Sequence, residues 1–228
     1  VPAHIQMEGY DVPQYANVQY PWEGHDEIRP GEIPEHFNPV ASYAKYFTVP
    51  ERMKGKRLFI SFQGAESGLA LWLNGEFVGY AEDSFTPSEF ELTDYVKDGE
   101  NKLAAQVFKW TSASWCEDQD FFRFSGIYRD VYLYTVPDIH VRDMKISACP
   151  DEELKNGALE IRLGMMAAEN ARGSARFQLV GDGKVISEEV LALEKETVWS
   201  CTVENPALWS AEEPNLYDLT VEIFDADG

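Results

Sequence analysis

The sequence predicts an all-β chain, and three observations support this prediction. Apolar side chains recur at every second position, the period of a strand with one buried face, in the segments 58–62, 69–73 and 103–107. Asn74-Gly75 separates two such runs in LWLNGEFVGY, and because this dipeptide readily takes positive φ angles it predicts a tight type I′ hairpin turn. No long helical period stands out. The chain is therefore expected to fold as strands half buried in a sandwich.

Strand patterns continue through GIYRDVYLYTV, residues 126–136, and are then interrupted. Pro137 lacks a backbone donor and Asp138 is a turn former, so we place a domain boundary before Pro137. Beyond it, a hairpin turn is predicted at Gly181–Gly183, and short strand patterns recur in IHVRDMKISA, GALEIRLGM, ARFQLVGDGKVISEE, ETVWSCTV and LYDLTVEIFD. This density of strands is typical of an immunoglobulin-like sandwich. The predicted domains are residues 1–136 and 137–228.

One long segment lacks this strand pattern. Residues 12–40, VPQYANVQYPWEGHDEIRPGEIPEHFNPV, are rich in proline and show little periodicity, so they are expected to form a long irregular loop. Loops of this length in compact domains often line ligands. The segment is therefore a candidate for function.

Composition indicates a soluble globular protein that avoids nucleic acids and membranes. Of its 228 residues 44% are hydrophobic, which is enough to form cores, and the formal net charge of −21 repels phosphate backbones and anionic lipids. No apolar run is long enough to span a bilayer. The cysteines are odd in number and lack a C-x-x-C pair, so free thiols are predicted at Cys116, Cys149 and Cys201. A cytoplasmic and a periplasmic location both remain open.

The segment WCEDQDFFRFSGIYRDV, residues 115–131, concentrates carboxylates among aromatic rings. A neutral sugar is recognised by carboxylates and amides that hydrogen-bond its hydroxyls and by rings that cover its C–H faces. We therefore select Asp120 as a binding carboxylate and Asn17, in YANVQYPW, as a binding amide. The alternatives are structural: an ion pair of Asp120 with Arg123 or Arg129, and a local backbone bond of Asn17 that shapes its loop.

Other chemistries have less support. Glu117 and Asp120 are a conceivable pair for glycoside hydrolysis, but acidic pairs beside arginines are more often solvated or ion-paired structure. The four histidines lack ligand spacing, and no nucleophile elbow, phosphate-binding loop or dinucleotide fingerprint is present. Trp72 and Trp209 are assigned to packing, because aromatic side chains at alternating positions of a sandwich are mostly core.

Two long segments resemble a known family. LALWLNGEFVGYAEDSFTPSEFELTDYVKDGENKLAAQVFKW and the following WCEDQDFFRFSGIYRDVYL resemble the amino-terminal sugar-binding domain of the family-2 glycoside hydrolases, in their β-galactosidase branch. VPAHIQMEGYDVPQYANVQYPW is similar to the start of this region, and ENPALWSAEEPNLYDLTVEI to the end of the first immunoglobulin-like domain. The resemblance covers essentially the whole chain.

The resemblance implies a galactose-binding-like jelly-roll sandwich, whose first strands this chain is expected to lack, followed by an immunoglobulin-like β-sandwich. It also implies that the chain is the non-catalytic amino-terminal part of a β-galactosidase. The two catalytic glutamates of such an enzyme lie on a (β/α)8 barrel that is absent here, so this part alone is expected to be inactive. Family members extend an Asp and an Asn from the first domain into the barrel pocket. By motif position these are Asp120, at the end of EDQD, and Asn17, at the start of N-V-x-Y-P.

Cofactors and partners also follow from the resemblance. Asp120 is expected to share a sodium ion with barrel residues, and the full-length enzyme is expected to use sodium and magnesium. The implied partners are a β-galactoside substrate, the barrel of the same chain and further copies in a homo-oligomer. Two alternatives stay open: a stand-alone carbohydrate-binding module, and an assembly domain of a related β-glucuronidase or β-mannosidase.

Overall fold

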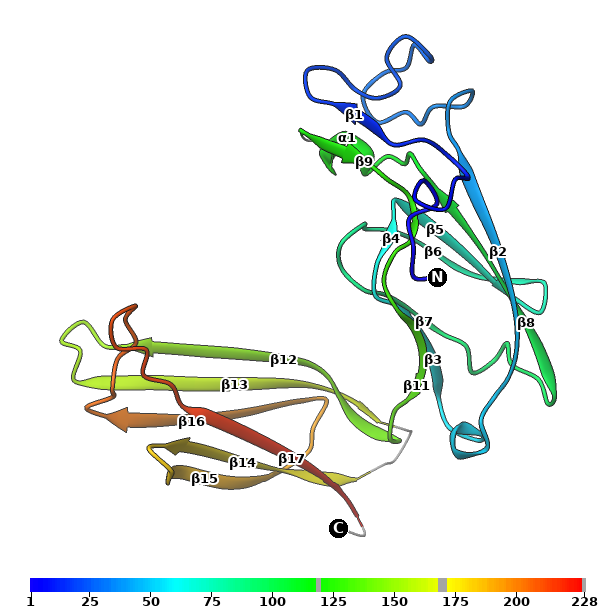
Figure 1. Cartoon of the computed structure of the whole chain (residues 1–228). Helices are drawn as coiled ribbons and strands as arrows, with labels where there is room; N and C mark the ends of the chain where they lie inside the picture. The colour runs from blue at the N-terminus through cyan, green and yellow to red at the C-terminus, as the bar shows by residue number, and fades with distance from the viewer. Residues whose placement is uncertain (118–119, 168–171, 227–228) are drawn as a thin grey trace. The chain divides into compact units, whose positions relative to one another are not determined.

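The computed structural model describes residues 1–117, 120–167 and 172–226. Contacts divide the chain into two units, Val1–Thr135 and Val136–Gly228, and strands dominate both, which confirms the predicted all-β class (Figure 1). The described residues include two short helical segments, the 3-10 turn Glu51–Met53 and α1, Ser114–Glu117. No helix in this part of the chain is both long and apolar enough to cross a membrane. The predicted free thiols are confirmed for Cys116, Cys149 and Cys201.

The first unit is a sandwich of two antiparallel sheets. The larger sheet has the order β2-β8-β5-β6, with the bounds Val40–Thr48, Glu100–Phe108, Gly68–Leu73 and Glu76–Glu82. The smaller sheet has the order β11-β3-β7, with the bounds Val131–Thr135, Leu58–Phe62 and Ser88–Glu91. A buried apolar core includes Leu58, Ile60, Phe62, Leu71, Leu73, Val107 and Ile127.

Strand β5 is buried on both faces rather than on one. Ala70 is only 5% exposed, although it alternates with the core residues Leu69 and Leu71. The register pairs Ala70 with Tyr80 on one side and with Gln106 on the other, so longer neighbours cover its small side chain. The expectation of a half-buried strand is therefore too simple for this inner strand of the sheet.

The second unit is a sandwich of two three-stranded sheets. One sheet has the order β12-β13-β16, with the bounds Ile139–Pro150, Asn156–Ala167 and Glu196–Glu204. The other has the order β15-β14-β17, with the bounds Lys184–Ala192, Gly173–Gly181 and Asp218–Asp225. Trp199, 2% exposed, stacks on Phe177 in the core with ring centroids 5.2 Å apart. This arrangement is the predicted second β-sandwich.

Both predicted hairpin turns are confirmed. Asn74 and Gly75 have φ angles of 55° and 92° and join β5 to β6. Asp182 and Gly183 have φ angles of 48° and 70° and join β14 to β15. Positive φ at both central residues is the requirement of the type I′ turn, which explains the choice of these dipeptides.

The assignment of Trp209 to the core is wrong, because this side chain is 64% exposed. Trp209 lies in the connection between β16 and β17, where an isolated bridge joins it to Pro214. It therefore belongs to no sandwich strand, and Trp199 fills the core instead. Trp72 is half-buried and packs edge-on against Phe77, with ring centroids 5.5 Å apart.

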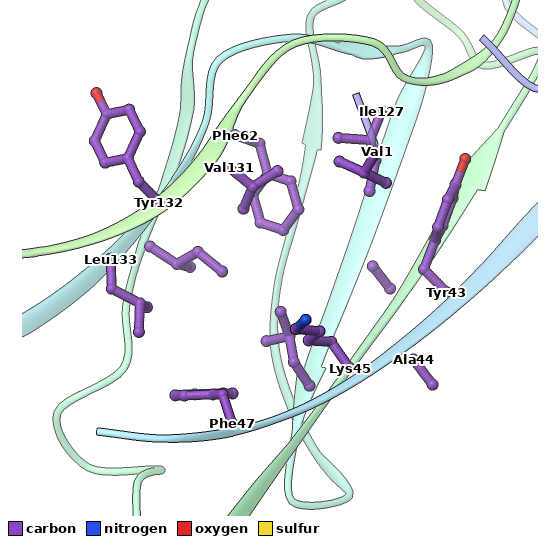
Figure 2. A pocket seen from close by; sticks show the side chains of 13 residues that line it. Val1, Tyr43, Ala44, Lys45, Phe47, Phe62, Ile127, Val131, Tyr132 and Leu133 are labelled. Atoms are coloured by element: carbon purple, nitrogen blue, oxygen red, sulfur yellow. The ribbon is translucent and has the colours of Figure 1, made fainter. Parts of the chain in front are cut away.

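An apolar cavity of about 410 Å³ opens between the two sheets of the first unit, beside the edge strands β2 and β11 (Figure 2). Its lining includes Tyr43, Phe47, Phe62, Val131 and Leu133. The polar side chains in this wall are those of Tyr43, Lys45 and Tyr132, and the described lining contains no carboxylate or side-chain amide of the kind expected at the sugar site. The cavity is therefore not the candidate sugar site. Whether the domain lacks its first strands is a separate question, and that expectation stays a prediction.

Two short ladders form one end of the first unit. Strand β1, Gln14–Ala16, pairs with β9, Phe121–Arg123, and β4, Ala65–Glu66, pairs with β10, Gly126–Ile127. Figure 1 shows β1, α1 and β9 grouped at this end. Strand β1 lies within the segment that was expected to be irregular, because three residues are too few to produce a recognisable period.

Candidate functional site

The β1–β9 ladder brings Asn17 and Asp120 to the same end of the first unit. Its register pairs Gln14 with Arg123, Tyr15 with Phe122 and Ala16 with Phe121. Asn17 follows the last pair on one strand, and Asp120 precedes it on the other. Antiparallel pairing therefore places both candidate residues beside each other, and both are exposed.

Tyr15 connects the two candidate residues. Its hydroxyl donates a hydrogen bond to Oδ1 of Asp120, which raises the pKa of Tyr15, whereas a side-chain hydrogen bond with Asn17 lowers it. The ring of Phe122 lies opposite, with its centroid 5.4 Å from that of Tyr15, and both side chains are more than half exposed. A carboxylate, an amide, a phenol and a phenyl ring are thus presented together to solvent.

Tyr15 was not among the predicted site residues. Alternate residues of an extended chain point to the same side, so Tyr15 and Asn17 share a side in YANV. That spacing is the signal that identifies Tyr15, once the segment is known to be extended.

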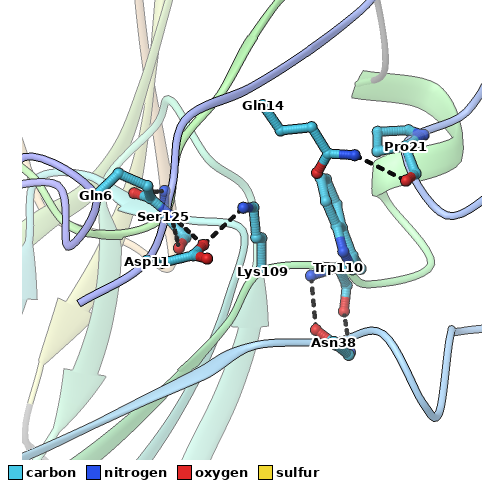
Figure 3. A network of polar contacts seen from close by, with 8 residues as sticks. All are labelled: Gln6, Asp11, Gln14, Pro21, Asn38, Lys109, Trp110 and Ser125. Atoms are coloured by element: carbon cyan, nitrogen blue, oxygen red, sulfur yellow. Dashed lines mark hydrogen bonds and ion pairs between the residues drawn. The ribbon is translucent and has the colours of Figure 1, made fainter. Parts of the chain in front are cut away.

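Side-chain contacts fix the loop that carries Asn17 on both sides of this residue, at Gln14 and at residues 20–22. Gln14 Nε2 donates a hydrogen bond of 2.8 Å to the carbonyl oxygen of Pro21 (Figure 3). Next to Pro21, the rings of Tyr20 and Trp22 stack with centroids 5.1 Å apart. These contacts hold the chain on both sides of Asn17.

An aromatic cluster joins this loop to the segment that leads to Asp120. Trp22 is 1% exposed and packs on Trp115 of α1, with ring centroids 4.9 Å apart, while Trp115 also contacts Tyr20 at 4.4 Å. Trp115 Nε1 donates to the carbonyl oxygen of Glu32 at 2.7 Å. These rings pack the segment that carries Asn17 against the segment that leads to Asp120.

Glu117 has a structural position. Its carboxylate accepts hydrogen bonds from the backbone nitrogen of Ser84 at 3.1 Å and from the hydroxyl of Ser84 at 2.7 Å. A carboxylate committed to a turn in this way does not suit the alternative in which Glu117 and Asp120 form a hydrolytic pair. The other members of the EDQD motif, Asp118 and Gln119, lie outside the described residues.

The two neighbouring arginines bind backbone carbonyl groups. Arg129 Nη1 donates to the carbonyl oxygen of Phe85 at 2.7 Å. Arg123 is 4% exposed, and its Nη1 donates to the carbonyl oxygen of Glu117 at 3.3 Å. These bonds fix the backbone around the site, whereas Asp120 presents its carboxylate to solvent.

A buried polar network attaches the amino-terminal segment to this end of the sandwich (Figure 3). Lys109, 2% exposed, donates to Oδ2 of Asp11 at 2.7 Å, and Gln6 Nε2 donates to the same atom at 2.8 Å and to Oγ of Ser125 at 2.9 Å. Burial raises the pKa of Asp11, but the hydrogen bonds from Lys109 and Gln6 outweigh it and leave the pKa below its ordinary value. The network therefore favours the charged pair.

Asp120 offers part of a site for a hard cation. Such cations take several oxygen ligands, and the Asp120 carboxylate is exposed while one of its oxygens accepts from Tyr15. Within the described ranges, no group of three or more His, Cys, Asp or Glu side chains is arranged to hold a metal ion. Asp120 therefore fits sodium only as one contributor to a site shared with other ligands.

Comparison with family models gives two matches along the chain. The model described as "Glycosyl hydrolases family 2, sugar binding domain" matches residues 1–137, and the model described as "Glycosyl hydrolases family 2" matches residues 139–228. Together they cover both units of the structure.

Curated relatives share this similarity over the whole chain. A β-galactosidase of Halalkalibacterium halodurans is 51% identical and one of Clostridium acetobutylicum is 50% identical, each over 100% of this chain. A β-galactosidase large subunit of Leuconostoc lactis is 41% identical, again over 100% of the chain. The chain spans only 23%, 25% and 38% of these relatives.

Solved structures show the same fold. β-Glucuronidase 2 of Bacteroides uniformis superposes with a TM-score of 0.72 at 24% identity, covering 87% of this chain and 26% of that chain. The β-D-mannosidase of Dictyoglomus thermophilum gives 0.68 at 22% identity, covering 83% of this chain and 28% of that chain. At these identities the likeness concerns the fold alone.

Proposed function

Because this chain belongs to glycosyl hydrolase family 2, we propose that it is the non-catalytic amino-terminal part of a β-galactosidase. The full-length enzyme hydrolyses terminal β-D-galactosyl residues with retention of configuration, using two glutamates on a (β/α)8 barrel beyond this chain. The 51% and 50% identity over the whole chain with relatives named β-galactosidase supports galactosides as the substrate class.

The observation that carries the proposal is the juxtaposition of Asn17 and Asp120 at the end of the β1–β9 ladder. The Asp120 carboxylate accepts hydrogen bonds from sugar hydroxyls, and the Asn17 amide can donate and accept. The exposed rings of Tyr15 and Phe122 lie beside them to cover the apolar face of the sugar. This end of the sandwich thus forms one wall of a pocket that the barrel completes.

The cation belongs to the same proposal. The Asp120 carboxylate would help to hold a sodium ion together with ligands from the barrel. Such an ion would supply a positive charge beside the oxygen atoms of the site. Magnesium acts elsewhere in the full-length enzyme, and the enzyme assembles as a homo-oligomer.

The test compares this chain with the full-length enzyme on an aryl β-galactoside. The chain alone is expected to release no chromophore. In the full-length enzyme Asp120→Asn is expected to lower kcat/KM by about 100-fold, because a charged hydrogen bond to the substrate is lost. Asp94→Asn, an exposed carboxylate after β7, is the matched control and should leave kcat/KM within about twofold. Chromophore release by the chain alone would contradict the assignment of catalysis to the barrel.

Two further measurements separate the alternatives. A stand-alone carbohydrate-binding module predicts saturable binding of galactose by this chain in calorimetry, lost in Asp120→Ala. A purely structural domain predicts full-length turnover that does not change in Asp120→Ala. A composite pocket predicts neither result.

A further inference from the structure

Tyr15 is the residue through which β1 contacts Asp120. It is the central residue of β1, and the ladder pairs it with Phe122 of β9. Asp120 lies two positions before Phe122, and a diagonal neighbour at this offset is within reach of a long side chain. The hydroxyl of Tyr15 donates a hydrogen bond to Oδ1 of Asp120. This contact joins two segments that are 105 residues apart in the sequence.

The hydrogen bond joins a residue that the sheet holds to one that the sheet does not hold. Tyr15 has a paired residue on each side of it in β1, so the ladder fixes its backbone. Asp120 lies in a bend before β9, outside the ladder. In the described part of the chain, the bond from Tyr15 is the hydrogen bond that orients the Asp120 carboxylate.

Neighbouring rings hold the phenol ring of Tyr15. Its centroid lies 5.4 Å from that of Phe122, the ring of Phe122 lies 6.2 Å from that of Phe124, and the ring of Phe124 lies 4.8 Å from that of His4. Packing along this row restricts the ring and therefore the direction in which its hydroxyl points. Tyr15 is nevertheless 54% exposed, so the core of the first unit does not depend on its hydroxyl.

The contact with Tyr15 leaves one oxygen of Asp120 for a ligand. A phenol has a single proton and occupies one carboxylate oxygen, whereas an arginine partner often occupies both. The hydrogen bond to Asp120 raises the pKa of Tyr15, so the phenol remains a donor at neutral pH. Among the described residues no donor reaches Oδ2 of Asp120, and this side chain is exposed. Oδ2 is therefore an acceptor that can bind a hydroxyl.

We propose that Tyr15 is a positioning residue for sugar binding: its hydroxyl holds Oδ1 of Asp120 and thereby directs Oδ2 towards a sugar hydroxyl. The inference rests on the proposed function and deepens it, because it assigns one oxygen of Asp120 to the protein and the other to the sugar. The hydroxyl of Tyr15 acts through Asp120, whereas its ring covers the sugar directly. Removal of the hydroxyl therefore affects sugar binding only while Asp120 is present.

The test is a double-mutant cycle in the full-length enzyme, with kcat/KM for an aryl β-galactoside as the readout. Tyr15→Phe keeps the ring and removes the hydroxyl, so kcat/KM is expected to fall about tenfold. In the Asp120→Ala background, which has no carboxylate to position, the same change should cost less than about twofold. The matched control is Tyr46→Phe, at a tyrosine of β2 that is 56% exposed, and it should leave kcat/KM within about twofold.

The melting temperature of this chain measures a purely structural role of the Tyr15 hydroxyl. Because the side chain is more than half exposed, Tyr15→Phe is expected to shift the melting temperature by less than about 2 °C. A fall of more than about 5 °C would assign the hydroxyl to the stability of the fold and would overturn the inference.

The kinetic outcomes separate this inference from the proposed function. If Asp120→Ala lowers kcat/KM and Tyr15→Phe does not, the role of Tyr15 is excluded and the sugar site stands. Equal losses from Tyr15→Phe in the parent and in the Asp120→Ala background would also overturn the inference, because the hydroxyl would then act independently of Asp120. If Asp120→Ala has no effect, the proposed function fails, and the inference fails with it.

Discussion

The two units differ in how deeply some of their cationic side chains are buried. In the first unit Lys109 and Arg123 are 2% and 4% exposed. In the second, Arg162 and Arg176 are 44% and 40% exposed by side chain and pair with glutamates on the sheet surfaces. Buried charges cost stability unless they are paired, whereas exposed pairs contribute little in either direction. Arg162 and Arg176 thus add little to the stability that the apolar core gives the second unit, whereas the first unit buries Lys109 and Arg123 at the end that presents Asn17 and Asp120.

The largest effect is expected in the apolar core of the second unit. Trp199→Ala should lower the free energy of unfolding by about 4 kcal/mol, because a fully buried ring stacked on Phe177 is lost. Trp209→Ala is the matched control and should change it by less than about 0.5 kcal/mol, because that ring is 64% exposed. Urea unfolding of this chain measures both. Equal effects would mean that the two tryptophans were assigned to the wrong environments.

The second-largest effect on the free energy of unfolding is expected for a buried charge of the first unit. Lys109→Met should lower the free energy of unfolding by about 3 kcal/mol, because Asp11 is left partly buried without its cation. Urea unfolding at pH 7 measures the loss. Lowering the pH should reduce the difference between variant and parent, since Asp11 then becomes neutral. A loss below about 1 kcal/mol would put Lys109 in the same class as the surface arginines of the second unit.

The stability of the first unit should depend on the charge of Glu66. Burial raises its pKa to about 7 in the fold against 4.5 ordinarily, so the folded state binds this proton more tightly than the unfolded chain does. The resulting stability is fully present below about pH 4.5 and is lost as the pH rises through 7, a change of about 2 kcal/mol between pH 5 and pH 8. Glu66→Gln should remove this slope in urea titrations, and Glu89→Gln, at an exposed glutamate of β7, should keep it. A parent slope of the opposite sign would contradict the burial argument.

The smallest effect is expected for the exposed pairs of the second unit. Arg176 Nε lies 2.6 Å from Glu188 Oε1, and its Nη1 lies 3.3 Å from Glu222 Oε2. Arg176→Gln should nevertheless change the free energy of unfolding by less than about 1 kcal/mol, because solvent screens these charges. Urea unfolding at low and high salt checks this value. A loss as large as that of Lys109→Met would remove the contrast between the units.

Much of this fold is predictable from local patterns. The period-two segments and the Asn74-Gly75 turn are local signals, and the structure contains the corresponding strands and hairpin. Strand β1 is too short to show a period, so the sequence predicts an irregular segment around Asn17. Helix α1 is too short to be recognised for the same reason. The sequence shows that Trp209 is apolar, which predicts a core position, but it does not show that the side chain is exposed.

The candidate site shows the same limit. Asp120 and Asn17 were selected by residue type and by resemblance, but their juxtaposition depends on the pairing of β1 with β9, which is a contact between distant parts of the chain. Burial of Glu66 and Arg123 is also a tertiary property, which the sequence alone does not reveal. Tyr15 becomes recognisable only once the strand is known.

The most direct test of the central claim is a double-mutant cycle on Asn17 and Asp120 in the full-length enzyme, with kcat/KM for an aryl β-galactoside as the readout. Each single change, Asn17→Ala and Asp120→Asn, is expected to lower kcat/KM. In the double variant the fold-loss of kcat/KM is expected to be smaller than the product of the two single fold-losses, which corresponds to a coupling energy of about 1 kcal/mol. The reason is that both side chains meet at Tyr15 and bind the same sugar. Independent effects, or no loss in either single variant, would contradict a shared wall of the pocket.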